Sequence, residues 1–139
     1  MSLPKASSKP SEATACPCES GQAYSHCCQP YHQGQAAPNA LALMRSRYSA
    51  YAMGLERYLL DTWHPDTRPD QLNLEEDAPI QWLGLQIKQT ATVSECQAKV
   101  EFVARYKVAG RAQHLHELSE FRQIGKRWYY LTGIAPTPT

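Results

Sequence analysis

Four cysteines lie close together near the start of the chain, as Cys16-Pro17-Cys18 followed by Cys27-Cys28. Thiolates are soft ligands, and four of them complete the closed tetrahedral shell that Zn²⁺ adopts in structural sites. A full set of protein ligands leaves no open position for a substrate or a reactive water. The spacing therefore predicts a structural zinc site with the ligands Cys16, Cys18, Cys27 and Cys28.

The cysteine count argues against a disulfide framework. Five cysteines would leave one unpaired, and the adjacent Cys27 and Cys28 could bond to each other only with strain. Unpaired thiols are typical of a reducing compartment, so we expect a cytoplasmic protein. We expect Cys96 to be a small apolar strand residue. We expect His26 and His32, which could replace a cysteine as ligands, to face solvent.

The residues between the two cysteine pairs must bring the sulfur atoms together. Ser20 and Gly21 predict a turn, and Ser20 could cap a short helix from about 21 to 28. Tyr24 is expected to pack against this module and shield one side of the metal. Because the segment has little apolar surface of its own, its folding should be coupled to metal binding. The alternative is a set of exposed thiols with no common ligand.

Composition excludes some classes of partner. The chain of 139 residues has 14 Lys and Arg against 13 Asp and Glu, a formal net charge of +1. This balance gives no long-range field towards nucleic acid or an anionic membrane. No apolar run approaches the ~18 residues of a membrane-spanning helix. We therefore expect neither a nucleic acid nor a membrane as partner.

Four segments can be distinguished by composition. They are a disordered tail at 1–15, the cysteine module at 16–34, a globular body at 38–134 and a frayed C-terminus at 135–139. The stretch from Gln35 to Pro38 is expected to act as a hinge between the module and the body.

The body begins with a helical pattern. Apolar residues recur at steps of three and four from Leu41 to Leu59, and Asn39 is a candidate N-cap. Gly54 should divide this run into two helices. The second helix should end at His64-Pro65, because a residue before proline disfavours the α region.

A β pattern follows from Ile80 onward. Glycine-containing turns are expected at 109–110 and 124–126, between strands near 83–87, 100–108, 113–122 and 128–131. Helices followed by an antiparallel meander predict an α+β fold with the helices on one face of the sheet.

Two parts of the chain resemble known families. The module at 16–34, with CPCESGQAYSHCC at 16–28, resembles the SEC-C zinc knuckle known from the C-terminus of the SecA translocase motor. The body is similar to the uncharacterised YchJ family in its motifs LMRSRYSAY (43–51), TWHP (62–65), WLGL (82–85), VARY (103–106) and WYYLTG (128–133). This resemblance implies a cystatin-like, nuclear-transport-factor-2-like (NTF2-like) roll, in which a curved antiparallel meander sheet packs on helices. It implies no biochemical activity.

One feature of the knuckle departs from the translocase pattern. No lysine or arginine lies between Cys18 and Cys27, whereas the translocase knuckle is rich in lysine there and docks on an acidic chaperone surface. The complementary charge is missing, so we do not expect the same chaperone as partner.

Rolls of this family often enclose a cavity. Alternation places Glu117 on the same strand face as Phe121, and a carboxylate facing the interior needs a cation or several donors. A buried arginine–glutamate pair that holds helix against sheet would meet this need, and so would a ligand pocket. The candidate pocket residues are Arg45, Arg47, Tyr48, His64, Glu117 and Ser119.

Two functions are compatible with these residues. The first is a protein-interaction or adaptor module with an unidentified protein partner, in which the roll supports the knuckle or forms a homodimer through its sheet. The second is a small-molecule-binding protein or enzyme that uses a pocket around Glu117 and His64. A filled interior with Glu117 paired to arginine would favour the first, and an open cavity the second. Because no nucleophile–base set accompanies these residues, the sequence favours the first.

Overall fold

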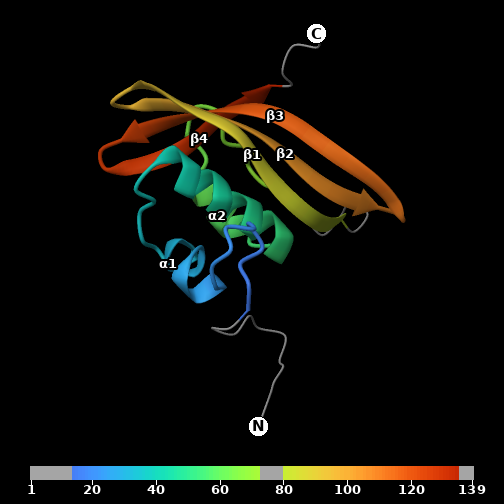
Figure 1. Ribbon diagram of the computed structural model, residues 1–139. Helices are drawn as coiled ribbons and strands as arrows, with labels where there is room; N and C mark the ends of the chain where they lie inside the picture. Colours follow the sequence, from blue (N-terminus) through green and yellow to red (C-terminus); the bar gives the residue numbers. More distant parts are fainter. Residues whose placement is uncertain (1–13, 73–79, 135–139) are drawn as a thin grey trace.

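The computed structural model describes residues 14–72 and 80–134. An antiparallel sheet of four strands lies over a central helix, and the cysteine module lies on the other side of that helix (Figure 1). The segments 1–13 and 135–139, where we expect a disordered tail and a frayed end, lie outside the described residues.

The sheet is a simple meander with the order β1-β2-β3-β4. Its strands are β1 (Ile80–Ser94), β2 (Gln97–Val108), β3 (Arg111–Ile124) and β4 (Arg127–Ile134). The turns between the last three strands lie where the sequence predicts them, because Gly110 and Gly125 supply the positive φ of 79° and 62°. The predicted α+β class, with helices on one face of a meander sheet, is confirmed.

The side chains of strand β1 do not alternate regularly between the two faces of the sheet. Its register with β2 shifts between Trp82 and Gly84. A bulge of this kind turns the following side chains to the other face. Trp82 and Leu85 therefore both face the interior, where Trp82 packs on α2 and Leu85 is buried. Leu83, at the bulge between them, is 40% exposed.

Strand β1 is also longer than its apolar residues indicate. It continues to Ser94 through a ladder with β2, although its second half has no buried side chain. The turn that follows contains Cys96, which is exposed. The prediction that Cys96 is an apolar strand residue is wrong, because the strand ends before it.

The two helices of the body are α2 (Ala40–Met53) and α3 (Glu56–Asp61). Asn39 caps α2, since its side-chain oxygen accepts a hydrogen bond of 2.8 Å from the Ala42 amide. Gly54 ends the helix in the left-handed conformation with φ 74°. No helix within residues 14–72 and 80–134 has the length and hydropathy of a bilayer span.

The chain leaves α3 earlier than predicted. The helix ends at Asp61, and Trp63 forms a parallel bridge with Tyr130 of β4. The His64 amide donates to the Tyr130 carbonyl at 2.7 Å. Pairing with the sheet edge, and not Pro65, therefore ends the helix.

Helix α2 packs one side on the covered face of the sheet. Leu43 and Tyr48 from α2 share one core cluster with Val100, Phe102 and Phe121. Full burial of an apolar side chain of this size contributes about 1.5–3 kcal/mol. These contacts fix α2 against the middle of the sheet.

The other side of α2 carries the cysteine module. Cys16, Cys18, Tyr24 and Cys28 belong to the same core cluster as α2 and the sheet. Ala37, in the expected hinge, is also buried. Part of this linker is thus packed on the core, while Gln35 and Pro38 are exposed. Tyr24 packs against the module as predicted.

Candidate functional site

The four cysteines of the module meet at one point, here called the cysteine centre. The sulfur atoms of Cys16, Cys18, Cys27 and Cys28 all lie within 4.8 Å of one another. The Sγ atoms of Cys18 and Cys27 are 3.5 Å apart, and those of Cys27 and Cys28 are 3.9 Å apart. Ligands of tetrahedral zinc, at about 2.3 Å from the metal, lie about 3.8 Å from each other. The donor set thus fits a tetrahedral metal ion.

A small hairpin holds the first cysteine pair. Ala15 pairs antiparallel with Ala23, and the Cys16 amide donates to the Gln22 carbonyl at 2.9 Å. Residues 14 and 15, which we expect in the tail, are thus part of the module. Glu19 turns the chain with a positive φ of 63°.

Two short helical turns return the second cysteine pair to the first. They are a 3₁₀ turn, η1 (Tyr24–His26), and α1 (Gln29–His32), in place of the single predicted helix. Ser20 caps no helix. Its hydroxyl instead lies 3.1 Å from the Cys27 sulfur.

A serine of α2 supports the centre from the other side. The Ser49 hydroxyl lies 3.5 Å from the Cys16 sulfur and donates to the Cys28 sulfur at 3.4 Å. Ser49 is fully buried. Sequence reasoning missed this residue, although a serine within the apolar stripe of α2 was the available signal. Hydroxyl donors stabilise sulfur ligands and fix their positions around a metal.

The four thiols also influence one another's ionisation. Hydrogen bonds from Cys16 and Cys28 lower the pKa of Cys18 well below its usual range. Hydrogen bonds to Cys16 and Cys18 raise the pKa of Cys28, and burial raises the pKa of Cys27 to about 11. Without a metal, a cluster of thiols thus favours a single thiolate, because neighbouring negative charges repel one another. A bound cation would offset this repulsion and allow several cysteines to be deprotonated.

Arg45 and His32 connect the module to α2. The Arg45 Nη1 atom donates to the Cys18 carbonyl at 2.8 Å. The His32 Nε2 atom is 2.8 Å from the Ser46 carbonyl, and its Nδ1 atom is 2.6 Å from the Tyr24 hydroxyl. Burial lowers the pKa of His32. The prediction that His32 faces solvent is wrong, because the docked module encloses it, whereas His26 is exposed as predicted.

A second site, here called the central pocket, lies between the opposite side of α2 and the sheet. Its volume is about 750 Å³, within the range of about 300–1,000 Å³ usual for ligand sites. The predicted pocket residues Arg47, Tyr48, Glu117 and Ser119 line it together. Its walls are largely aromatic and aliphatic, with Met44, Tyr51, Trp82, Phe102, Leu115 and Tyr130 among them.

Two predicted residues lie away from this pocket. Arg45 faces the cysteine centre instead, because it lies on the opposite side of α2. His64 lies beyond α3, where its Nδ1 atom accepts a hydrogen bond of 3.1 Å from the Asp66 amide. The sequence places Arg45 beside the apolar stripe of the first helix and His64 at a helix end, but it does not give the direction of either side chain.

Glu117 contributes an acidic group to the central pocket. Its Oε2 atom accepts hydrogen bonds from the Ser119 hydroxyl at 2.6 Å and the Tyr130 hydroxyl at 3.4 Å. The carboxylate occupies the space that a Cβ atom on Gly133 would need. The absence of a side chain at Gly133 thus makes room for the acid.

Arg47 contributes a buried cation, only 4% exposed. Its Nη1 atom donates to the Leu59 carbonyl and the Thr62 hydroxyl, each at 2.7 Å. The guanidinium carbon lies 5.0 Å from the Trp63 ring centroid and 4.6 Å from that of Tyr130. Burial lowers the pKa of Arg47, which the nearby tyrosines and Glu117 partly offset.

The expected arginine–glutamate pair does not form. The ion pairs within residues 14–72 and 80–134 join Arg57 to Asp61, His64 to Asp66 and His116 to Glu101. Arg47 and Glu117 face the same pocket but each bonds to other groups.

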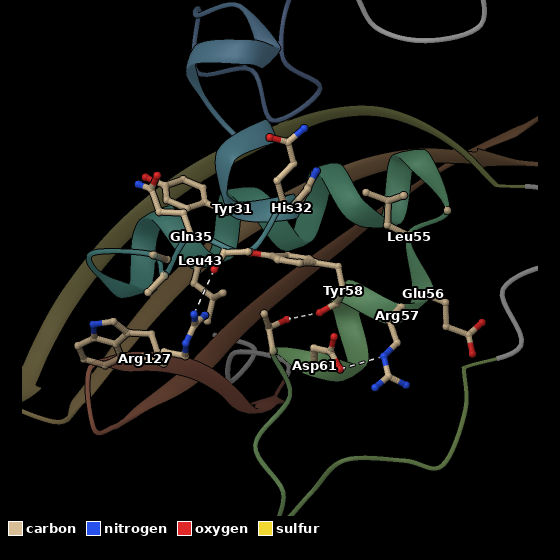
Figure 2. Close-up of a pocket in the computed structure, with 17 residues that line it drawn as sticks. Tyr31, His32, Gln35, Leu43, Leu55, Glu56, Arg57, Tyr58, Asp61 and Arg127 are labelled. Atoms are coloured by element: carbon tan, nitrogen blue, oxygen red, sulfur yellow. Dashed lines mark hydrogen bonds and ion pairs between the residues drawn. The ribbon is translucent and has the colours of Figure 1, made fainter.

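A third feature, here called the side hollow, has a volume of about 670 Å³ between α1, α3 and β4. Figure 2 shows the Arg57–Asp61 ion pair of α3. Arg127 donates a hydrogen bond of 3.1 Å to the Gly34 carbonyl, at the end of the cysteine module. His32, which also lines the hollow, is bonded on both ring nitrogens. The polar groups that line the side hollow thus largely bond to other groups of the protein.

Comparison with known proteins accounts for both parts of the chain. The family model for the middle NTF2-like domain of YchJ matches residues 39–133, and the SEC-C motif model matches residues 14–30. A UPF0225 protein of Chromobacterium violaceum is 52% identical over 132 residues, covering 91% of this chain and 97% of that protein. One from Bordetella parapertussis is 51% identical over 127 residues, covering 89% and 95%.

Solved structures agree with this assignment. The solution structure of a SEC-C motif protein from Rhodopseudomonas palustris has a TM-score of 0.77 at 34% identity, over 88% of this chain and 98% of that one. A crystal structure of a SEC-C motif protein from Psychrobacter arcticus has a TM-score of 0.75 at 29% identity, over 92% and 86%. With an SEC-C motif ahead of an NTF2-like domain, the chain belongs to the YchJ (UPF0225) family.

Proposed function

We propose that this protein binds a small molecule in the central pocket and carries a structural zinc ion in its cysteine centre. The single observation that carries the pocket function is the cavity of about 750 Å³ that combines aromatic walls with the carboxylate of Glu117. An apolar cavity with a few convergent polar groups is the usual form of a ligand site. The open cavity and the missing Arg47–Glu117 pair favour this function over a purely structural interior.

The proposal of zinc rests on the chemistry of the donors. Four thiol sulfurs at tetrahedral spacing suit zinc better than the hard cations, which prefer oxygen. Arg45 and Ser49 hold the backbone and the sulfurs in place, so the ion would be structural. Such a centre requires reduced cysteines, which supports a cytoplasmic location.

Metal analysis tests the zinc proposal. Elemental analysis of protein purified under reducing conditions should find about one zinc per chain. The Cys28→Ser variant should lose most of it, and the exposed Cys96→Ser variant should keep it. Metal-free wild-type protein with the same fold would contradict the proposal.

Blocking the cavity tests the pocket. Ala52 lies on α2 at the pocket wall and is exposed, so Ala52→Trp should fill the cavity without disturbing the core. A neutral aromatic probe, 2-phenylethanol, should give saturable NMR shifts at Trp82 in the wild type and not in this variant. Ala112→Trp, at an exposed strand position outside the pocket, is the matched control and should bind normally. Equal binding by both variants would exclude the central pocket as the site.

An adaptor role is the second candidate. It is supported by the outer face of the sheet, which no described helix covers (Figure 1). Strand alternation places Val103 and Leu118 on this face. We propose that this face contacts an unidentified protein or a second copy of the chain. Sedimentation of the wild type and Val103→Lys tests the homodimer, since a change from dimer to monomer would support it. A wild-type monomer at high concentration would contradict it.

A further inference from the structure

We propose that the central pocket selects a cationic ligand, a small amine with an aromatic or aliphatic body. This inference rests on the proposed function and adds the charge and chemical class of the ligand. It depends on three features of the pocket. They are a Glu117 oxygen without a hydrogen bond from the described residues, an arginine whose guanidinium is bonded elsewhere, and the aromatic walls.

The first feature is the Glu117 carboxylate. Both of its hydrogen bonds are accepted by Oε2, and Oε1 accepts none from the described part of the chain. Glu117 is half-buried and lines the cavity. A carboxylate oxygen that faces a cavity can accept a hydrogen bond from a ligand, and a charged N–H group is the strongest donor for it.

The second feature is that Arg47 donates no hydrogen bond to this oxygen. Its Nη1 atom is bonded to the Leu59 carbonyl and the Thr62 hydroxyl. Its charge lies against the rings of Trp63 and Tyr130, and the side chain is 4% exposed. The cation is thus held by the protein, and the more accessible charge in the pocket is the acid.

The third feature is the set of aromatic walls. Trp82 packs against Tyr48 with ring centroids 5.6 Å apart and against Tyr51 at 5.9 Å. The electron-rich faces of such rings attract cations and also stack on an aromatic body. A neutral or anionic ligand would gain the stacking but not the cation attraction.

Three probes of nearly equal size test the charge of the ligand: phenethylammonium, 2-phenylethanol and 3-phenylpropionate. Their dissociation constants are measured by NMR titration of the full chain at pH 7. Phenethylammonium should bind at least about tenfold more tightly than the neutral alcohol, because only the ammonium adds charge attraction to the hydrogen bond that either probe can donate to the carboxylate. The propionate should bind most weakly.

Two variants assign this preference to the carboxylate. Glu117→Gln keeps the shape and the bonds from Ser119 and Tyr130, and it should remove the preference for the ammonium. Gly133→Ala keeps the charge but displaces the Glu117 carboxylate. It should weaken the binding of phenethylammonium and leave the binding of the other two probes unchanged. Glu101→Gln, on the other face of the sheet and paired with His116, is the matched control and should change nothing.

The possible outcomes separate the inference from the proposed function. The inference of a cationic ligand would be overturned if all three probes bound equally or if the propionate bound most tightly. It would also be overturned if Glu117→Gln kept the preference for the ammonium. The pocket itself would stand as long as 2-phenylethanol binds and Ala52→Trp blocks it. If none of the three probes binds the wild type, the pocket function fails, and the cationic ligand fails with it.

Discussion

The cysteine centre and the central pocket lie on opposite sides of one helix, and they differ in how fully their polar groups are hydrogen-bonded within the protein. From α2, Ser49 and Arg45 face the cysteine centre, whereas Arg47 and Tyr48 face the pocket. Around the centre, the side chains of α2 and of the module bond to one another. In the pocket, the Glu117 carboxylate keeps an oxygen that no described residue uses.

This difference separates structural from binding roles. Buried polar groups that satisfy one another stabilise a single arrangement. A group that the protein leaves incomplete beside a cavity does not contribute in this way, and it is available to a ligand. The comparison leads to opposite expectations for mutations on the two sides of α2.

Removal of the metal should have the largest effect. Structural zinc contributes about 10–16 kcal/mol in small zinc-binding peptides, which is comparable with the 5–15 kcal/mol of a typical domain. Because the cysteine centre belongs to the same core as α2 and the sheet, a chelator should destabilise the whole chain. Circular dichroism melts with and without chelator measure this.

The matched control for metal removal is Cys96→Ala, which should melt like the wild type with and without chelator. A roll whose melting temperature is unchanged by the chelator would contradict the integrated core. It would support a knuckle that folds independently of the body, as expected if the stretch from Gln35 to Pro38 were a hinge.

Arg47→Met should have the next largest effect. It leaves the Leu59 carbonyl and the Thr62 hydroxyl without their donor and removes two cation–π contacts. We expect a loss of about 2 kcal/mol or more in the free energy of unfolding, measured with urea. Arg57→Met is the control, since its ion pair with Asp61 is exposed and should contribute less than about 1 kcal/mol. Equal losses in the two variants would mean that the buried contacts of Arg47 with Leu59 and Thr62 do not stabilise the fold.

Ser49→Ala sharpens the comparison on the metal side. Loss of a group that supports metal ligands typically lowers metal affinity by about 10–100-fold. Competition with a chromophoric chelator measures this affinity in the folded protein. Ser94→Ala, in an exposed part of β1, is the control and should leave the affinity unchanged. An unaltered affinity in Ser49→Ala would mean that the hydroxyl only fills space.

Much of the fold could be predicted because local signals agree with it. Asn39 and Gly54 mark the ends of α2, and Gly110 and Gly125 mark two turns. The extension of β1 to Ser94 could not be predicted, because its second half has no apolar face and depends on pairing with β2.

The two sites differ in how far the sequence predicts them. The cysteine ligands are close in the chain, so their spacing alone brings them together. The surroundings of the centre depend on the docking of the module onto α2, which no local pattern encodes. For this reason the sequence does not reveal that His32 is enclosed or that Ser49 contacts the cysteine sulfurs. In the pocket, strand alternation correctly predicts that Glu117 faces the interior. The helical pattern does not show that the Arg45 side chain lies on the other side of α2, at the cysteine centre.

Glu117→Leu should have the smallest effect on stability. The pocket carboxylate is half-buried and receives two hydroxyl bonds on one oxygen, so its loss removes little that holds the fold. A leucine there would extend the apolar wall, and we expect a change within about 1 kcal/mol of the wild type in urea unfolding. Residues retained for binding are often neutral or costly for stability.

Glu117→Lys is the comparison variant for this last prediction. It would place a second cation in the same pocket as Arg47, with neither paired to a carboxylate, and it should be clearly less stable than Glu117→Leu. If leucine and lysine were equally damaging, the carboxylate would be as much a structural element as the cysteine centre. The contrast between the two sides of α2 would then be lost.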